Sequence, residues 1–387
     1  MPASSSPGPE LPVDPVRKPS VEPVRTRSRL REFVELPYRL YEGDPHFVPP
    51  LRGECRRLLS RRHNPFFAYG DAELFTARRD GRVVGRIAAV HNPRHNEVHQ
   101  ARDGFFGQFE CEDDPAVARA LIDTASGWLR RRGLATMLGP FNFTTNDECG
   151  LLVDGFDTSP RVLMPYNPPY YPALLESCGL AKAKDLWTWE RGTQPPGDRL
   201  LRLYERVQRR EQVSVRTLDL RHFDRDLAKI RHVYHVAWRH NWGFVPMTDA
   251  ELTAFARRLR RIVDPSLVLL VEAAGEPVAA GLAVPDVNQA LSAARGRSTP
   301  IGLLRLSRAA RAITQTRGLL LGVVPGYRER GLELLLYGRF LEAARTGGYR
   351  GTTEFGWTLE DNRPINQSMT ALGCTHAKTY RIYGKDL

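Results

Sequence analysis

Cysteine is scarce in this chain of 387 residues, and the five that occur are scattered without a C-x-x-C pair. They are Cys55, Cys111, Cys149, Cys178 and Cys374. An odd number of dispersed cysteines is typical of a reducing compartment and argues against a zinc site. The sequence therefore predicts a cytoplasmic protein without a bound metal.

Long apolar runs are missing as well. No stretch approaches the ~20 consecutive apolar residues of a membrane-spanning helix, and the N-terminus lacks the apolar core of a signal peptide. Residues 1–27 are instead rich in proline and serine, with few large apolar side chains. We therefore expect 1–27 to be a disordered tail, with order beginning near Leu30.

Lysine is also rare, so almost all of the positive charge is arginine. Lys and Arg total 56 against 44 Asp and Glu, a formal net charge of +12 with a pI near 9.7. Arginine favours bidentate contacts with phosphate or carboxylate. Charge alone admits nucleic acid, an anionic cofactor or an acidic membrane surface. No RNP, helix-turn-helix or finger pattern accompanies it, which argues against nucleic acid.

The most informative stretch is 319–346, which reads as strand, turn and helix. Residues 319–324 are apolar and of strand length, and a turn rich in Gly and Arg follows at 325–331. From Leu332 the apolar period becomes helical and ends at Gly347-Gly348. A Gly-bearing turn entering a helix leaves backbone N–H groups unpaired, which suits a phosphate or pyrophosphate. A plain crossover turn between strand and helix has the same pattern.

The same succession of elements occurs twice in a chain long enough for two domains. In the first half we expect a hairpin at 74–77 and 83–90, a strand at 104–110, a helix at 115–133 and a strand at 135–143. In the second half the corresponding elements are 267–272, 278–284, 319–324, 332–346 and 351–357. Two local matches, 141–144 with 355–358 and 177–184 with 371–378, indicate a duplication.

This order of elements resembles the GNAT superfamily of acyl-CoA-dependent N-acyltransferases, present as two GNAT-like lobes. The resemblance implies an α/β fold (an α+β mixed sheet) in which each lobe has a mixed β-sheet flanked by helices. It assigns 28–195 to an N-terminal lobe on the acceptor side and 196–387 to a C-terminal lobe that binds acyl-CoA. It implies acyl-CoA as co-substrate and no metal.

The turn 328–333 is similar to the Q/R-x-x-G-x-G/A pyrophosphate loop of the family, with Glu333 in place of the last Gly or Ala. Asn362 looks like the asparagine of the next family motif, whereas Met369 stands where a tyrosine often serves as general acid. The turn at 111–115 of the first half is acidic and would repel a pyrophosphate. The residues that the resemblance assigns to CoA are Val323, Val324, Arg328, Glu329, Arg330, Gly331, Leu332 and Asn362.

Four further segments, 145–156, 164–171, 241–246 and 378–383, look like a bacterial two-lobe GNAT group that includes ceramide synthases. This finer resemblance implies acylation of a long-chain, sphingoid-like amine. It places acceptor contacts at Asn146, Tyr170 and Trp242. N-acetylation of a small amine, or a CoA- or ligand-binding protein without activity, are the alternatives.

Amine acylation needs a base for the amine, a polarised thioester carbonyl and a proton donor for the leaving thiolate. Asp147 and Glu148 are the candidates for the base, directly or through water, although such carboxylates also serve as surface or capping groups. Tyr166 or Tyr383 could supply the acid, although tyrosines also pack in cores.

Three other side chains could take part in the chemistry. His91 and His240 are alternative bases, although a lone histidine is more often structural. Cys149 is an alternative acyl-carrying nucleophile, although no histidine is adjacent to it in sequence and GNAT transfer is usually direct.

A basic amphipathic helix is expected at 301–313. One face would hold Leu303, Leu306, Ala310 and Ile313, and the other Arg305, Arg308 and Arg311. Such a helix can lie on an anionic bilayer or pack on the second lobe with solvated arginines. The first reading predicts peripheral contact with the inner face of the membrane.

Overall fold

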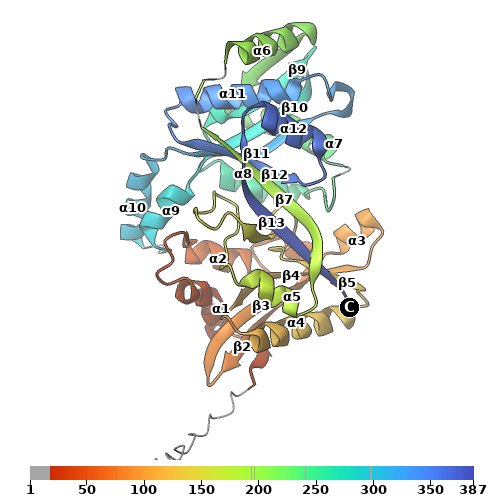
Figure 1. Ribbon diagram of the computed structural model, residues 1–387, viewed down its shortest axis with the longest axis vertical. Helices are drawn as coiled ribbons and strands as arrows, with labels where there is room; N and C mark the ends of the chain where they lie inside the picture. Colours follow the sequence, from red (N-terminus) through yellow and green to blue (C-terminus); the bar gives the residue numbers. More distant parts are fainter. Residues whose placement is uncertain (1–17, 193, 196, 240, 297–298) are drawn as a thin grey trace, which may run out of the picture.

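The computed structural model describes residues 18–387 except 193, 196, 240, 297 and 298 (Figure 1). In the N-terminal half the elements are β1 (Ser20–Pro23), α1 (Arg27–Leu40), α2 (Arg52–Leu58), η1 (Pro65–Ala68), β2 (Asp71–Arg79), β3 (Arg82–His91), α3 (Pro93–His99), β4 (Asp103–Cys111), α4 (Pro115–Arg130), β5 (Thr136–Gly139), β6 (Leu151–Asp154), α5 (Tyr171–Ser177) and β7 (Ala181–Gly192).

In the C-terminal half they are α6 (Asp198–Arg210), β8 (Val213–Thr217), η2 (Leu220–His222), α7 (Phe223–Ala237), α8 (Asp249–Leu259), η3 (Pro265–Leu267), β9 (Val268–Ala273), β10 (Glu276–Pro285), α9 (Asn288–Ala294), α10 (Pro300–Ala310), β11 (Thr316–Val323), η4 (Pro325–Tyr327), α11 (Leu332–Thr346), β12 (Thr352–Leu359), α12 (Arg363–Ala371) and β13 (Thr375–Asp386).

The described strands form one 13-stranded mixed sheet that runs through both lobes. Its order is β1-β2-β3-β4-β5-β13-β7-β12-β11-β10-β9-β8, with β6 paired to β13. The final strand of each half therefore crosses to the other: β13 pairs with β5, and β7 pairs with β12. In Figure 1 these two long strands run side by side through the middle of the molecule, and the C-terminus lies beside β5.

The registers have an internal two-fold relationship. Thr379 of β13 is paired with Trp187 of β7, and Ile382 of β13 with Lys184 of β7. Residues 187 and 382 differ by 195, as do 184 and 379, so a shift of 195 positions converts one pair into the other. The parallel ladders repeat too: Asp103–Thr136 in β4 and β5 corresponds to Thr316–Thr353 in β11 and β12. The two halves thus share one topology about a central axis.

Each lobe buries a separate core under one long helix. The apolar stripe of α4, which includes Val117, Leu121 and Ala125, is fully buried against β2 to β4 in the first core. The second core packs around α11, with Leu336 and Phe340 at 0% and 1% exposure. Spacings of three and four residues place such side chains on one face of a helix, which explains the position of both helices.

Three sequence-based expectations need correction. Residues 1–17 lie outside the described residues, but 20–23 of the predicted tail form β1, which pairs with β2. The strand predicted at 135–143 ends at Gly139, because the chain then turns back over β4. The two-fold ladders align Gly139 with Gly356, so the proposed match of 141–144 with 355–358 is displaced by three residues.

No helix in the described ranges combines the length and the apolar character needed to cross a membrane. Residues 300–310 form α10, but its exposed face differs from the predicted one. Ile301 and Leu304 are 66% and 59% exposed, on the same side as the exposed Arg305 and Arg308. The side chain of Leu303 is outside the described set.

Candidate active site

The sheet opens at the C-terminal ends of two parallel strands in the second lobe. Strands β11 and β12 pair through three rungs, of which Gly318 and Phe355 form the last. Beyond that rung the described parts of the two strands pair only outward, β11 with β10 and β12 with β7. Unpaired strand edges offer backbone groups that an extended ligand with amide bonds can use.

The opening leads to the N-terminus of α11. Gly331 is its N-cap residue at φ +88°, a backbone region that glycine enters without steric cost. Gly331 has no side chain with which to cap this helix. The positive end of the helix dipole therefore lacks an N-cap acceptor for the first backbone N–H groups of α11.

The two arginines of the turn have different surroundings. Arg328 donates to the carbonyl oxygens of Val323 and Ala237, at 3.3 and 2.6 Å, so it holds the turn against the end of α7. Arg330 is half-exposed beside Glu211, at 3.1 Å. The guanidinium of Arg328 is thus held by carbonyl oxygens of the protein itself, whereas Arg330 lies on the surface where an anionic ligand could reach it.

Glu333 lies over the same helix start. Burial raises the pKa of its carboxyl, and hydrogen bonds from the backbone amides of Glu333 and Glu329 act in the opposite direction. The carboxylate therefore uses part of the N–H groups that a pyrophosphate would need. Glu333, in place of the last Gly or Ala of the family loop, therefore leaves fewer N–H groups for a phosphate at this helix start.

The equivalent place in the first lobe is closed. Asp114 caps α4 by accepting from the N–H groups of Ala116 and Val117, at 2.8 and 3.3 Å. The chain after β5 folds over β4 so tightly that a Cβ on Gly107 would lie 1.9 Å from the carbonyl oxygen of Phe141. The two lobes therefore differ in just the feature that an anionic cofactor requires.

A loop of the first lobe, residues 144–149, extends to the second lobe. Asn146 donates from Nδ2 to the carbonyl of Val245 (2.9 Å) and accepts at Oδ1 from Tyr234 of α7 (2.6 Å). Thr145 donates to the carbonyl of Gly243 at 2.9 Å. The predicted acceptor residue Asn146 is thereby fixed beside the 241–247 segment that also carries Trp242.

The two predicted bases lie in this loop. Burial raises the pKa of Asp147 to about 7, although the positive charge of Arg258 and a hydrogen bond from Thr144 both act to lower it. Burial also raises the pKa of Glu148, which accepts from Asn142 at 3.2 Å. A carboxyl group with a pKa near 7 can gain and lose a proton at neutral pH, which is what general-base catalysis requires.

The predicted tyrosines lie elsewhere. Tyr383 is fully buried in the core of the first lobe and donates to Glu176 at 3.0 Å. Tyr170 donates to the carbonyl of Cys111 at 2.8 Å, in the closed end of the first lobe. Tyr166 donates to Asp44 at 2.9 Å, although it packs on the same aromatic cluster as Trp242.

The remaining predicted residues are also placed. Asn362 is the N-cap residue of α12 without a side-chain cap bond, whereas Asn366, which sequence reasoning missed, is buried and accepts from Thr358 at 2.8 Å. Burial lowers the pKa of His91 on β3. His240 lies outside the described residues. Burial raises the pKa of Cys149 to about 12, which leaves little thiolate.

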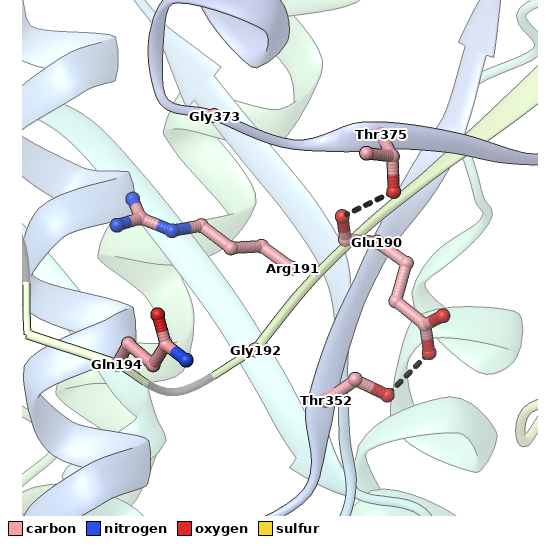
Figure 2. Close-up of a pocket in the computed structure, with 7 residues that line it drawn as sticks. All are labelled: Glu190, Arg191, Gly192, Gln194, Thr352, Gly373 and Thr375. Carbon is pink, nitrogen blue, oxygen red and sulfur yellow. Dashed lines mark hydrogen bonds between the residues drawn. The ribbon is translucent and has the colours of Figure 1, made fainter.

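A hollow of about 360 Å³ lies at the other end of β12, beside its first residue Thr352. Figure 2 shows Glu190 between Thr352 and Thr375, with Arg191 and Gln194 nearby. The strands part beyond Phe355, toward the opposite end of β12. We therefore place the candidate site at the parted strands, because the open helix N-terminus and the loop 144–149 are found there.

No protein-family model matches the chain. It is 37% identical to the bacterial ceramide synthase of Caulobacter vibrioides (strain NA1000 / CB15N) over 381 residues, covering 95% of this chain and 97% of that protein. It is 31% identical to protein YghO of Escherichia coli (strain K12) over 368 residues, covering 93% and 94%.

Among solved structures, the fold matches a tandem GNAT protein from the clavulanic acid biosynthesis pathway, with a TM-score of 0.53 and 14% identity. The match covers 95% of this chain and 98% of that one. The glucosamine N-acetyltransferase region of a fungal β-N-acetylglucosaminidase has a TM-score of 0.57 at 11% identity, over 96% of this chain and 38% of the other. The chain has the tandem GNAT fold and belongs to the family of the bacterial ceramide synthase.

Proposed function

We propose that the C-terminal lobe binds acyl-CoA and that the protein transfers the acyl group to a long-chain, sphingoid-like amine. The observation that carries the first part is the difference between the two helix starts. The N-terminus of α11 is open at Gly331, whereas Asp114 caps the N-terminus of α4. The pyrophosphate would lie at α11, and the thioester arm would run along β11 between the parted strands.

The acceptor would approach from the first lobe. Support comes from the loop 144–149, which crosses to α7 and the 241–247 segment. Around it lies an aromatic cluster that includes Phe67, Tyr69, Tyr166 and Trp242. A lipid amine needs such an apolar surface for its chain and a few polar groups near its head. The similarity to the bacterial ceramide synthase of Caulobacter vibrioides supports that substrate class.

In the proposed reaction Asp147, with Glu148 next to it, accepts a proton from the amine directly or through water. The amine nitrogen forms a bond to the thioester carbonyl carbon, the C–S bond breaks, and the thiolate takes a proton. Asp147 is the better of the two candidates, because burial raises its pKa to about 7 while Thr144 donates a hydrogen bond to one oxygen of its carboxyl group.

We also propose that the protein acts at the inner face of the membrane, with α10 touching anionic lipid. Ile301 and Leu304 are exposed next to Arg305 and Arg308 on one side of α10. Apolar side chains can enter the interface while each arginine near an anionic surface contributes ~1 kcal/mol. We expect the wild type to sediment with phosphatidylglycerol vesicles and an Arg305→Glu, Arg308→Glu variant to lose this binding. Unchanged sedimentation of the variant would disprove the contact.

The main test measures CoA release from acyl-CoA chains of increasing length, with sphinganine and with a short-chain amine as acceptors. We expect release that depends on sphinganine and on a long acyl chain. Release with short amines and acetyl-CoA alone would support the small-amine alternative instead. Thermal stabilisation by CoA without turnover of any acceptor would support a ligand-binding protein.

A further inference from the structure

A buried pair of opposite charges lies directly below the point where β11 and β12 part. Arg317 and Glu354 are Cα partners, one rung before Gly318 and Phe355. They are 4% and 2% exposed. Phe355 packs on Tyr337 of α11, and neighbouring residues of a strand point to opposite faces. Glu354 therefore lies on the face away from α11, which is the side of the loop 144–149.

Both members of this pair are only partly hydrogen-bonded, and Nε of Arg317 has no partner among the described residues. Arg317 donates to the carbonyl oxygens of Val162 and Gly356 and to the sulfur of Met164. In the part of the chain that the structure describes, Oε1 of Glu354 is buried without a hydrogen-bond partner. Buried polar atoms are almost always paired, so an unpaired carboxyl oxygen at this position requires an explanation.

The tyrosine acid that the family often has is missing from its usual place. Met369 holds that place, and it is fully buried in the core around α11. The hydroxyl groups of Tyr166 and Tyr383 are donated to Asp44 and Glu176.

On β13 the buried hydroxyl of Tyr380 also lacks a hydrogen-bond partner among the described residues and lies near Glu354. Burial raises the pKa of Tyr380 well above its ordinary value, so Glu354 is the stronger acid of the two possible proton donors to the leaving thiolate.

We propose, on the basis of the proposed acyl transfer, that Glu354 is this proton donor: its protonated carboxyl group donates to the sulfur of CoA as the C–S bond breaks. Asp147 takes a proton from the attacking nitrogen, the C–N bond forms, and the electron pair of the C–S bond leaves on sulfur. The sulfur then takes the proton of Glu354, so that amide and free CoA thiol result. Exchange with solvent returns both carboxyl groups to their starting states.

The charges around Glu354 allow both of its protonation states. Burial raises its pKa to about 7, whereas Arg317 on β11, Arg161 before β7 and Lys378 on β13 act in the opposite direction. Glu190 on β7 is the Cα partner of Glu354, and its carboxylate raises the pKa of Glu354 further. Both the protonated and the ionised form of Glu354 are therefore populated at neutral pH.

The decisive experiment compares pH profiles of kcat in the full-length protein, with acyl-CoA and sphinganine. In the wild type we expect kcat to fall above about pH 7 as Glu354 loses its proton. In Glu354→Gln we expect kcat to fall 10²–10⁴-fold, with CoA-dependent thermal stabilisation retained and the alkaline fall absent. Glu190→Gln is the control on the neighbouring strand. It should keep the alkaline fall, moved to lower pH, because the Glu190 carboxylate that raises the pKa of Glu354 is lost.

Several results would overturn the assignment. A kcat of Glu354→Gln within a few fold of the wild type would do so, as would an alkaline fall that persists in that variant. If Glu354→Gln does not fold, Glu354→Asp retains a carboxyl group with shorter reach and should show a reduced kcat with the alkaline fall still present. Its absence in a folded Glu354→Asp would contradict the proposal. Wild-type protein without turnover of any amine would instead refute the acyltransferase function itself.

Discussion

Tyr234 of α7 donates a hydrogen bond of 2.6 Å to Oδ1 of Asn146, a residue of the other lobe. Nδ2 of Asn146 in turn donates a hydrogen bond to the carbonyl oxygen of Val245, at 2.9 Å. This chain of contacts fixes the loop that carries Asp147 and Glu148 against the lobe with the open helix N-terminus. The distance between the two proposed partners of the reaction is therefore set by side chains from both halves.

Tyr234→Phe removes the donor to Asn146 and leaves its oxygen unpaired in a largely buried place. We expect a loss of about 1–3 kcal/mol in the free energy of unfolding and a lower kcat at unchanged CoA affinity. Denaturant unfolding and CoA-release kinetics would measure the two effects. Tyr349→Phe, whose hydroxyl donates to Asp264 far from the loop, is the control, and equal kinetic losses in both variants would contradict a role in alignment.

Gly331→Ala should weaken CoA binding. At φ +88° a side chain costs about 1–3 kcal/mol of backbone strain, and a Cβ would lie 3.0 Å from Cγ2 of Val207. The helix start would shift, and the CoA-dependent rise in Tm should shrink.

Gly326→Ala is the matched control for that substitution, because a Cβ there meets no described atom within 4 Å. It should retain the full rise in Tm with CoA. Asp114→Ala should cost about 0.5–2 kcal/mol of stability by removing the cap of α4. A change in the CoA affinity of Asp114→Ala would show that CoA binds to the first lobe, contrary to the proposal.

Asp147→Asn should abolish the rise of kcat with pH that we expect near pH 7. The pKa of Asp147 is raised to about 7 from an unfolded value near 3.9. The folded state therefore binds the proton more tightly, and the stabilisation by protonated Asp147 is lost as the pH rises through about 7. Relative to Asp147→Asn, the wild type should become less stable between about pH 4 and pH 7.

The measurement is a set of urea unfolding curves at several pH values together with the pH profile of kcat. A wild-type stability that stays parallel to that of Asp147→Asn across this range would contradict the raised pKa. Retention of the rising limb of kcat in Asp147→Asn would assign the base elsewhere, first of all to Glu148.

Cys149→Ala should retain most of the activity. The thiol is 3% exposed, and burial raises its pKa to about 12, so the thiolate needed for a covalent acyl intermediate is not formed at neutral pH. Mass spectrometry of the protein after mixing with acyl-CoA should show no acyl adduct. An adduct that disappears in Cys149→Ala would reverse this conclusion and support stepwise transfer.

Neither half should fold by itself. The fragment 1–195 lacks β13, which pairs with β5 and contributes the fully buried Tyr383 to the first core. The fragment 196–387 lacks β7, which lies between β12 and β13. We expect both fragments to be unfolded by circular dichroism when expressed alone, and soluble when expressed together. A cooperatively folded single fragment would show that the exchanged strands are dispensable.

The amino-acid sequence by itself determined the local elements and the difference between the two halves. Helix α11 spans 332–346 as the period of its leucines predicts, and the Gly-bearing turn before it is open. The acidic turn at 111–115 became a capped helix start because aspartate before proline is a strong N-terminal signal. Such features depend on neighbours in sequence, and so they can be read from it.

Only the tertiary structure decided which strands pair across the two halves and which side chains meet. The exchange of β7 and β13 joins residues almost 200 positions apart, and no local preference specifies it. The same exchange put Tyr383 into the core of the first lobe, and the parallel pairing of β11 with β12 placed Glu354 opposite Arg317. Pairing register and burial arise from contacts distant in sequence. The sequence alone therefore could not show that the predicted tyrosines lie away from the site or that Glu354 lies close to it.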